Sequence, residues 1–338
     1  MINTKNGAVV SALVAVALAS SAAVAADKFT MKIGMATIND SNHVMAKWMA
    51  EDIAKRTNGR IEVKVFPAAQ LGTIPRQVEG IQLGTQEAFL GPPGFLIGLN
   101  QAFMVTDAPG VFDSISHQSR ALNHDSFRDK FFHIAEEKGV VGNVIWSCGD
   151  TSINTVKPFE KLADLKGKKI RVLATPIERA VMEKLGATGV PMPYTEVLPA
   201  MQRNAIDGVR TGVIVMYPSK FYTVAKHLTL TALGHISCGQ WLSAAWLKKL
   251  PADLQKAVAD SGRAVTPHVM KWGEEMTRDA EKKWVEAGGK VYHLPAAEQK
   301  WAREAVASIG PDLLGKNEKT QAMFTLMLDA VKATRKAK

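Results

Sequence analysis

The chain has 338 residues, 46% of them hydrophobic, and 42 Lys and Arg against 32 Asp and Glu give it a formal net charge of +10. This length indicates two lobes rather than one core. The basic residues are scattered among acids along predicted helices, which favours a field that attracts small anions over a nucleic-acid surface.

The first 26 residues have the layout of a secretory signal peptide. Lys5 provides the positive start, an apolar run at 8–19 is interrupted only by Ser11, and 20–26 is rich in small residues. The alternative, a membrane anchor, wants roughly 18 apolar residues, and the run is shorter. We therefore predict cleavage after Ala25 or Ala26. The mature chain would carry a net charge of 41 − 32 = +9 and lie in the periplasm of a Gram-negative bacterium.

The first half alternates strand and helix patterns, which indicates parallel βαβ units. The predicted strands are 32–37, 60–66, 87–90 and 140–146. The predicted helices are 43–57, 75–83 and a long stretch at 116–138.

The second half repeats this pattern. Predicted strands are 169–173, 188–192 and 290–294, and predicted helices are 176–185, 195–204, 251–287 and two more at the C-terminus. Thr175 followed by Pro176 and Glu178 is a strong helix start with a capping box. Pro267 should kink the helix over 251–287 rather than end it, because the apolar periodicity resumes after it.

One charged residue stands inside an apolar run, at Arg171 in 169–173. Side chains alternate along a strand, so Ile170 and Val172 share one face and Arg171 shares the other with Leu173. Burial of an unpaired charge costs several kcal/mol, so this guanidinium requires an anionic partner. A planar fork of N–H donors fits a carboxylate. The alternatives are an internal ion pair and a solvated edge position.

The sequence contains no recognisable catalytic constellation. The metal and nucleophile motifs H-E-x-x-H and G-x-S-x-G are absent, and 310–316 resembles a phosphate-binding loop but follows a predicted helix and lacks its Ser or Thr. Isolated His and Cys residues do not make a zinc set. Cys148 and Cys238 would either pair in an oxidising compartment or stay separate buried thiols. We therefore predict no catalytic residue, no metal and no cofactor.

Several segments together resemble the solute-binding proteins of tripartite ATP-independent periplasmic (TRAP) transporters, which carry C4-dicarboxylates, sialic acid and other organic acids. The resemblance rests on R-T-N-G-R-I-E-V-K-V-F-P-A-A-Q-L-G at 56–72, R-Q-V-E-G-I-Q-L-G-T at 76–85, L-K-G-K-K-I-R-V at 165–172, G-A-T-G-V-P-M-P-Y-T-E-V at 186–197 and N-A-I-D-G at 204–208. It extends over about residues 30 to 295.

The resemblance implies the α/β fold of a two-lobed periplasmic binding protein, in which each lobe is a βαβ sheet flanked by helices and one long kinked helix spans both. We expect lobe I at 27–149 plus 235–270 and lobe II at 150–234 plus 271–338. A monomer would capture an organic acid anion, predicted to be a monocarboxylate, between the lobes. It would then deliver the ligand to the small and large membrane subunits of a permease, without ATP hydrolysis. Two alternatives are a periplasmic enzyme acting on a small organic acid and a ligand-sensing subunit for a sensor kinase.

By this resemblance Arg171 binds the ligand's carboxylate. Tyr194 stands where an aromatic residue usually lies beside the ligand, and Thr211 where an Asn usually reaches it. Arg210 replaces an acid and either adds a second cation to the pocket or faces solvent. The alternative for Arg171 is an internal ion pair or a solvated edge position, and the alternative for Tyr194 is a buried residue flanking a helix.

Four further positions are predicted near the ligand on weaker grounds. Many relatives carry a second Arg about twenty residues before the first, a place that falls here on Asp150, or on Thr151 if the register shifts by one. An acid there would repel a second carboxylate, which is why a monocarboxylate is predicted. Asn39, His43 and Trp241 lie where the first strand-to-helix loop and the hinge should face the cleft.

Overall fold

The computed structural model describes residues 27–335, so the predicted signal peptide lies outside the described residues. Within 27–335 no helix combines the length and the apolar character that crossing a bilayer requires. The strands are β1 (Phe29–Gly34), β2 (Ile61–Phe66), β3 (Ala88–Gly91), β4 (Val140–Thr155), β5 (Lys169–Val172), β6 (Thr188–Pro191), β7 (Gly208–Gly212), β8 (His227–Ser243) and β9 (Lys290–His293). They form one mixed sheet in the order β2-β1-β3-β8-β4-β7-β5-β6, and β9 also pairs with β8.

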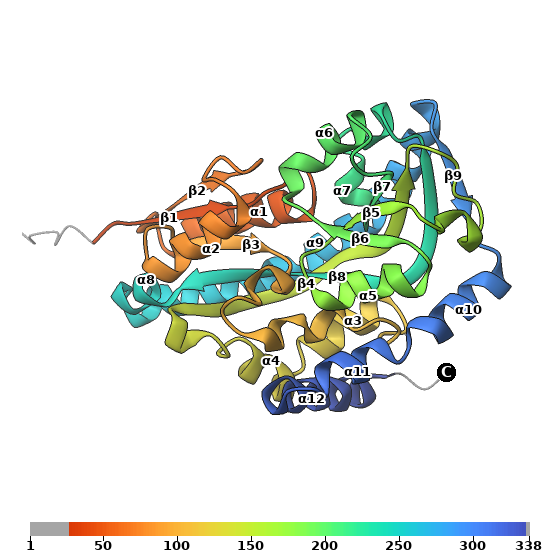
Figure 1. The fold of residues 1–338 in the computed structure, drawn as a ribbon. Coiled ribbons are helices and arrows are strands. Elements are labelled where there is room, and N and C mark those ends of the chain that lie inside the picture. The colour runs from red at the N-terminus through yellow and green to blue at the C-terminus, as the bar shows by residue number, and fades with distance from the viewer. Residues whose placement is uncertain (1–26, 336–338) are drawn as a thin grey trace, which may run out of the picture.

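Helices pack around this sheet, as Figure 1 shows. They are α1 (Ser41–Arg56), α2 (Ile74–Leu83), α3 (Ile115–Leu122), α4 (Asp125–Phe131), α5 (Pro176–Lys184), α6 (Val197–Gln202), α7 (Val213–Met216), α8 (Ala244–Lys249), α9 (Ala252–Glu286), α10 (Ala296–Val306), α11 (Ile309–Leu314) and α12 (Glu318–Thr334). Short 3-10 turns include η1 (Pro93–Leu96) and η2 (Gln101–Asp107).

Two long antiparallel strands, β4 and β8, connect the halves of the molecule (Figure 1). The parallel group β2-β1-β3 joins the end of β8 near Gln240, and the group β7-β5-β6 joins the opposite end of β4 near Asn154. The β4–β8 register shifts between Ser147 and Ser152, where Gly149 has a φ of 94°. Such bulges bend a strand and increase its twist. The two halves of the sheet therefore meet at a bend.

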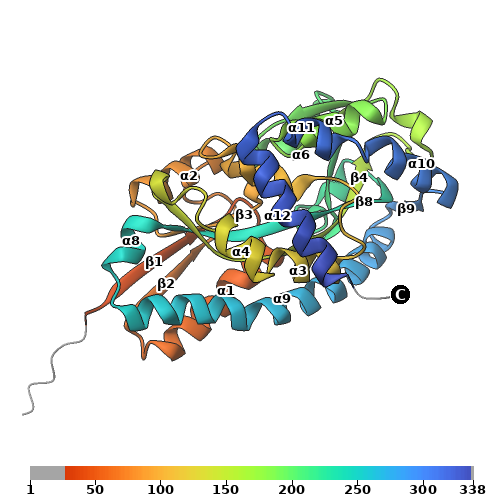
Figure 2. The same ribbon diagram turned by 90° about the horizontal axis from the view of Figure 1, so that it is seen from below.

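The expected α/β fold with a long spanning helix is confirmed. Helix α9 continues through Pro267 and runs along the molecule in Figure 2, packing on α1, β4 and α7. The predicted helix at 116–138 is in fact two helices and a turn, because Asn123 ends α3 and donates its side-chain amide to the carbonyl oxygens of Ser119 and Ile145. Three helices, not two, follow β9.

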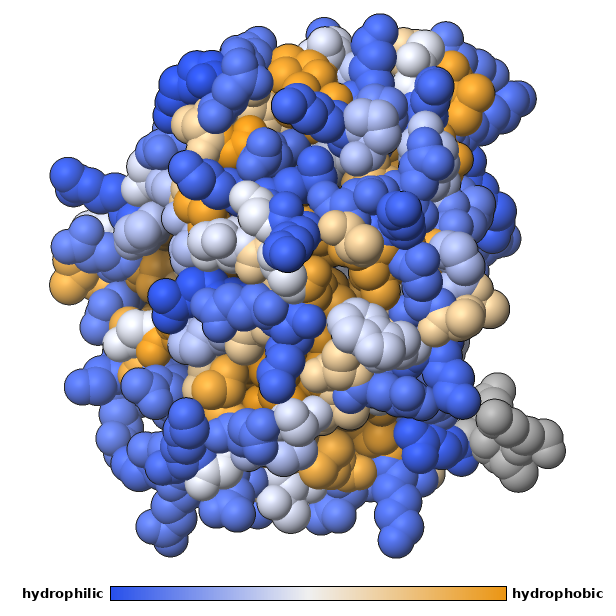
Figure 3. Space-filling view, turned by 45° about the vertical axis from the view of Figure 1, so that its right-hand side comes forward, coloured by the Kyte–Doolittle hydropathy of each residue, from blue (hydrophilic) through white to orange (hydrophobic). Residues whose placement is uncertain are grey.

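The predicted lobe boundaries remain a prediction. Strands β4 and β8 each pass through both halves, and α12 packs against α3, α4 and η2, which come early in the chain. One apolar core includes Phe103 and Phe131 together with Ile170 and Val181, and a second surrounds Met45 and Trp146. On the face shown in Figure 3, hydrophobic residues are visible at the middle between hydrophilic side chains.

Candidate functional site

Arg171 lies in a cavity between the two groups of strands. Its side chain is 1% exposed, on β5, and alternation along that strand is as predicted: Ile170 and Val172 enter the core while Arg171 and Leu173 line the cavity. Burial lowers the pKa of the guanidinium to about 10, so it remains a cation at neutral pH. The cavity therefore contains a fixed positive charge.

The guanidinium keeps donors available for a ligand. Nε and Nη2 donate to the carbonyl oxygen of Met192, at 3.3 and 3.2 Å. A guanidinium has five N–H donors, so these bonds leave three. Within residues 27–335 no carboxylate forms an ion pair with Arg171, and Glu178, whose charge acts on the guanidinium, binds Arg210 instead. Neither a protein ion pair nor a solvated position accounts for Arg171.

Tyr194 and Thr211 lie at the same cavity, as the sequence predicted. The guanidinium carbon of Arg171 is 5.7 Å from the centre of the Tyr194 ring, within the usual range of a cation–π contact. The Tyr194 hydroxyl donates to the carbonyl oxygen of Val215 and contacts Ser219 Oγ. These bonds hold the hydroxyl end of the side chain, while Arg171 lies over the face of the ring. Burial raises the pKa of Tyr194, which therefore stays neutral.

Thr37 and Asn42 line the opposite wall, and sequence reasoning missed both. Asp40 caps α1 by accepting from the backbone N–H of His43, and the Asn42 amide donates to Asp40 Oδ2 and to Thr37 Oγ1, at 3.1 and 3.3 Å. Burial raises the pKa of Asp40. The sequence did point to this loop, but it selected Asn39 and His43. Those two residues bond to each other, the Asn39 N–H donating to His43 Nδ1, and line no part of this cavity.

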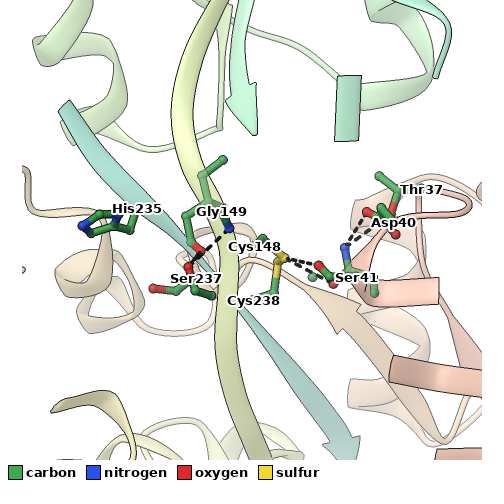
Figure 4. The surroundings of a disulfide bond; sticks show 12 residues. Thr37, Asp40, Ser41, Cys148, Gly149, His235, Ser237 and Cys238 are labelled. Atoms are coloured by element: carbon green, nitrogen blue, oxygen red, sulfur yellow. Dashed lines mark hydrogen bonds between the residues drawn. A yellow bond between two sulfur atoms is a disulfide. The ribbon is translucent and has the colours of Figure 1, made fainter. Parts of the chain in front are cut away.

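A disulfide joins Cys148 on β4 to Cys238 on β8, which decides between the two alternatives left open by the sequence. Figure 4 shows it between the two long strands, with Ser41, Asp40 and Thr37 on one side and His235 and Ser237 on the other. Both cysteines line the cavity. The disulfide therefore forms part of the surface that a ligand would touch.

Arg210 is neither a second cation in the cavity nor a solvated residue. Its side chain is 2% exposed, Nη1 donates to Glu178 Oε2, and Nη2 donates to Thr151 Oγ1. Adjacent residues of a strand face opposite ways, so Thr211 lines the cavity while Arg210 points to the other side of β7. Thr151 was the alternative to Asp150 as a ligand-binding residue. It accepts a hydrogen bond from Arg210 and does not line the cavity.

Asp150 and Trp241 lie away from Arg171. Asp150 pairs with His235 at a separate, wider groove that Glu274 and Arg303 also line. Trp241 is fully buried against Phe103, Phe131 and Phe132. Its Nε1 donates to the carbonyl oxygen of Gly91, which does line the cavity. Trp241 therefore contacts a residue of the cavity wall without lining the cavity itself.

Most of the chain matches a known protein family. Residues 34–314 match the model of a family described as bacterial extracellular solute-binding protein, family 7. The chain belongs to this family. This match and the solved structures of TRAP solute-binding proteins that are similar to the chain confirm the predicted resemblance.

Relatives match most of the chain. A solute-binding protein of Verminephrobacter eiseniae is 30% identical over 71% of this chain and 72% of its own length. The C4-dicarboxylate-binding periplasmic protein DctP of Rhodobacter capsulatus is 27% identical over 89% and 90%. Among solved structures, a TRAP periplasmic solute-binding protein of Desulfovibrio salexigens with bound orotic acid is 25% identical, covers 91% of this chain and all of its own, and has a TM-score of 0.87. The galactonate complex of the sugar acid binding protein DctPAm from Advenella mimigardefordensis is 25% identical, covers 91% of this chain and 99% of its own, and has a TM-score of 0.85.

Proposed function

We propose that this protein captures an organic acid anion in the Arg171 cavity and delivers it to the two membrane subunits of a TRAP permease. The observation that carries the proposal is a buried guanidinium with three remaining donors and no acidic partner among residues 27–335. A carboxylate supplies the missing charge and accepts parallel N–H bonds. The named ligands of the relatives, among them orotic acid and galactonate, are organic acids.

The ligand we propose is a monocarboxylate. Arg171 is the one cation that lines the cavity in the described part of the chain, because Arg210 is already neutralised by Glu178 and faces away. A second carboxylate would be buried without a partner, at a cost of several kcal/mol. We further propose that the protein acts as a periplasmic monomer, exported by its N-terminal signal, and does no chemistry on the ligand.

Substitution of Arg171 tests this function. We expect Arg171→Lys to weaken carboxylate binding at least ~100-fold, because an ammonium cannot donate two parallel bonds and each charge-assisted bond contributes ~1.5–3 kcal/mol. Arg179→Lys, an exposed change on the following helix, is the matched control. Titration calorimetry measures both, with thermal melting to verify folding. Unchanged affinity in a folded Arg171→Lys protein would reject the carboxylate site.

The enzyme and sensor alternatives have their own tests. Ligand recovered by mass spectrometry after prolonged incubation should be chemically unchanged, and a converted product would indicate an enzyme. Reconstituted uptake with the two permease subunits should depend on this protein. A loss of signalling rather than of uptake on deletion would favour the sensor subunit.

A further inference from the structure

The cavity around Arg171 offers few free polar groups. Besides Arg171, the polar side chains that line it are Thr37, Asn42, Tyr194 and Thr211. The Asn42 amide donates to Asp40 and Thr37, and the Tyr194 hydroxyl is engaged with Val215 and Ser219. What remains for a ligand is the Asn42 side-chain carbonyl and two threonine hydroxyls, one of which already accepts a bond. These groups cannot satisfy a ring of ligand hydroxyls.

The rest of the wall is hydrophobic, although it comes from elements far apart in the sequence. Phe89 lies on β3, Phe95 on η1, Val215 on α7 and Ile236 on β8. Leu173 follows Arg171 on the same strand face, and the Cys148–Cys238 disulfide lies between β4 and β8. Apart from the guanidinium, a bound molecule would meet mainly carbon and sulfur.

The lining decides which ligand groups can bind favourably. Each hydroxyl buried without a partner costs ~1–3 kcal/mol, whereas a hydrocarbon group gains from leaving water. The polarity of the lining therefore disfavours a polyhydroxylated acid.

We infer that the ligand is a monocarboxylate whose body is hydrocarbon, aliphatic or aromatic, seated between Phe89, Val215 and the disulfide while Arg171 binds its carboxylate. This inference rests on the proposed function, since it assigns the chemistry of the ligand at that same site. It sets this protein apart from the galactonate-binding relative, whose ligand carries a hydroxyl on nearly every carbon.

Titration calorimetry with four probes tests the inference: benzoate, 4-methylpentanoate, galactonate and succinate. We expect at least one hydrocarbon acid to bind ten-fold or more tightly than galactonate and succinate. If galactonate or succinate binds most tightly and Arg171→Lys abolishes that binding, the inference is wrong and the proposed function stands. If neither hydrocarbon acid binds, the inference is also wrong. If every acid that binds does so equally well in Arg171→Lys, the proposed function itself fails.

A pair of variants on α7 tests the hydrophobic wall directly. Val215 lines the cavity, whereas Val213, two residues earlier on the same helix, packs into the core around Met216. Val215→Thr keeps the shape but places a hydroxyl against the ligand, and should weaken hydrocarbon-acid binding about ten-fold. Val213→Thr, the matched control, should leave affinity unchanged. Ile236→Thr repeats the test from β8 if Val215→Thr does not fold. Equal affinity of folded Val215→Thr and Val213→Thr proteins would overturn the inference.

Discussion

The buried carboxyl group of Asp107, near Arg210 and Glu178, should make the stability of the protein depend on pH. Asp107 ends η2 and faces Glu178, Arg210 and Thr175, with His235 lining the same small cavity. Its Oδ2 is buried and has no hydrogen-bond partner among residues 27–335. Burial, reinforced by the charge of Glu178, raises the pKa of Asp107 from 3.8 to about 8.

A raised carboxyl pKa destabilises the folded state as pH rises. Below pH ~4 Asp107 is protonated whether the chain is folded or unfolded, so it contributes nothing to pH dependence. Between pH ~4 and ~8 the folded state holds a proton that the unfolded state has released, and stability falls. From pH 3.8 to 7 this is 3.2 × 1.36, or about 4 kcal/mol, if the full shift applies. Asp107 is partly exposed at its surface, so about 2–4 kcal/mol is the expected range.

Asp107→Asn removes the titrating group and with it this loss of stability at rising pH. Denaturant unfolding from pH 4 to pH 8 should show a variant similar to wild type at pH 4 and more stable than wild type by about 2–4 kcal/mol at pH 7. Asp312→Asn, which removes an exposed carboxylate from α11, is the control for the loss of one negative charge. Parallel stability curves for wild type and Asp107→Asn would refute the reasoning.

Two further sets of substitutions test the contacts that support the site. The disulfide closes a loop with a sequence separation of 90, for which chain entropy predicts a stabilisation of about 4–5 kcal/mol. A Cys148→Ala, Cys238→Ala double variant should lose stability of that order, and equal urea midpoints without reductant would contradict it. Glu178→Gln removes the carboxylate that Arg210 contacts and should cost up to about 3–5 kcal/mol, less the part that Asp107 recovers by ionising near Arg210. Adding Arg210→Met should recover part of that loss in the same urea titrations, and a double variant less stable than Glu178→Gln would exclude the buried pair as the cause.

Local patterns predicted the parts of this protein that local forces determine. The strand at Arg171 was predictable from alternation, and the start of α5 was predictable because Thr175 accepts from the backbone N–H of Glu178. The same helix start shows the limit of local reasoning. A capping box would turn the Glu178 carboxylate back toward Thr175, but tertiary contact directs it to Arg210 on β7.

The longest strand was the least visible in the sequence. Strand β8 is buried along most of its length, with a polar Gln240 at 0% exposure and glycines at 234 and 239, so it lacks regular alternation. Central strands covered on both faces lose that signal. Asn42 was missed because its place at the cavity depends on how the start of α1 packs beside β1, which no local pattern reveals.

The bend in β4 and β8 connects these observations. The register shifts between Ser147 and Ser152, and within this stretch the disulfide ties Cys148 to Cys238 on β8. The disulfide therefore joins the two strands at the bulge itself, and paired residues flank it on both sides. Thr37 and Asn42 reach the cavity from the β1 side, whereas Arg171 and Tyr194 reach it from the β5 side. We predict that a carboxylate held by Arg171 and touching the opposite wall bridges that bend, so a variant that changes the angle between the halves should also change ligand affinity.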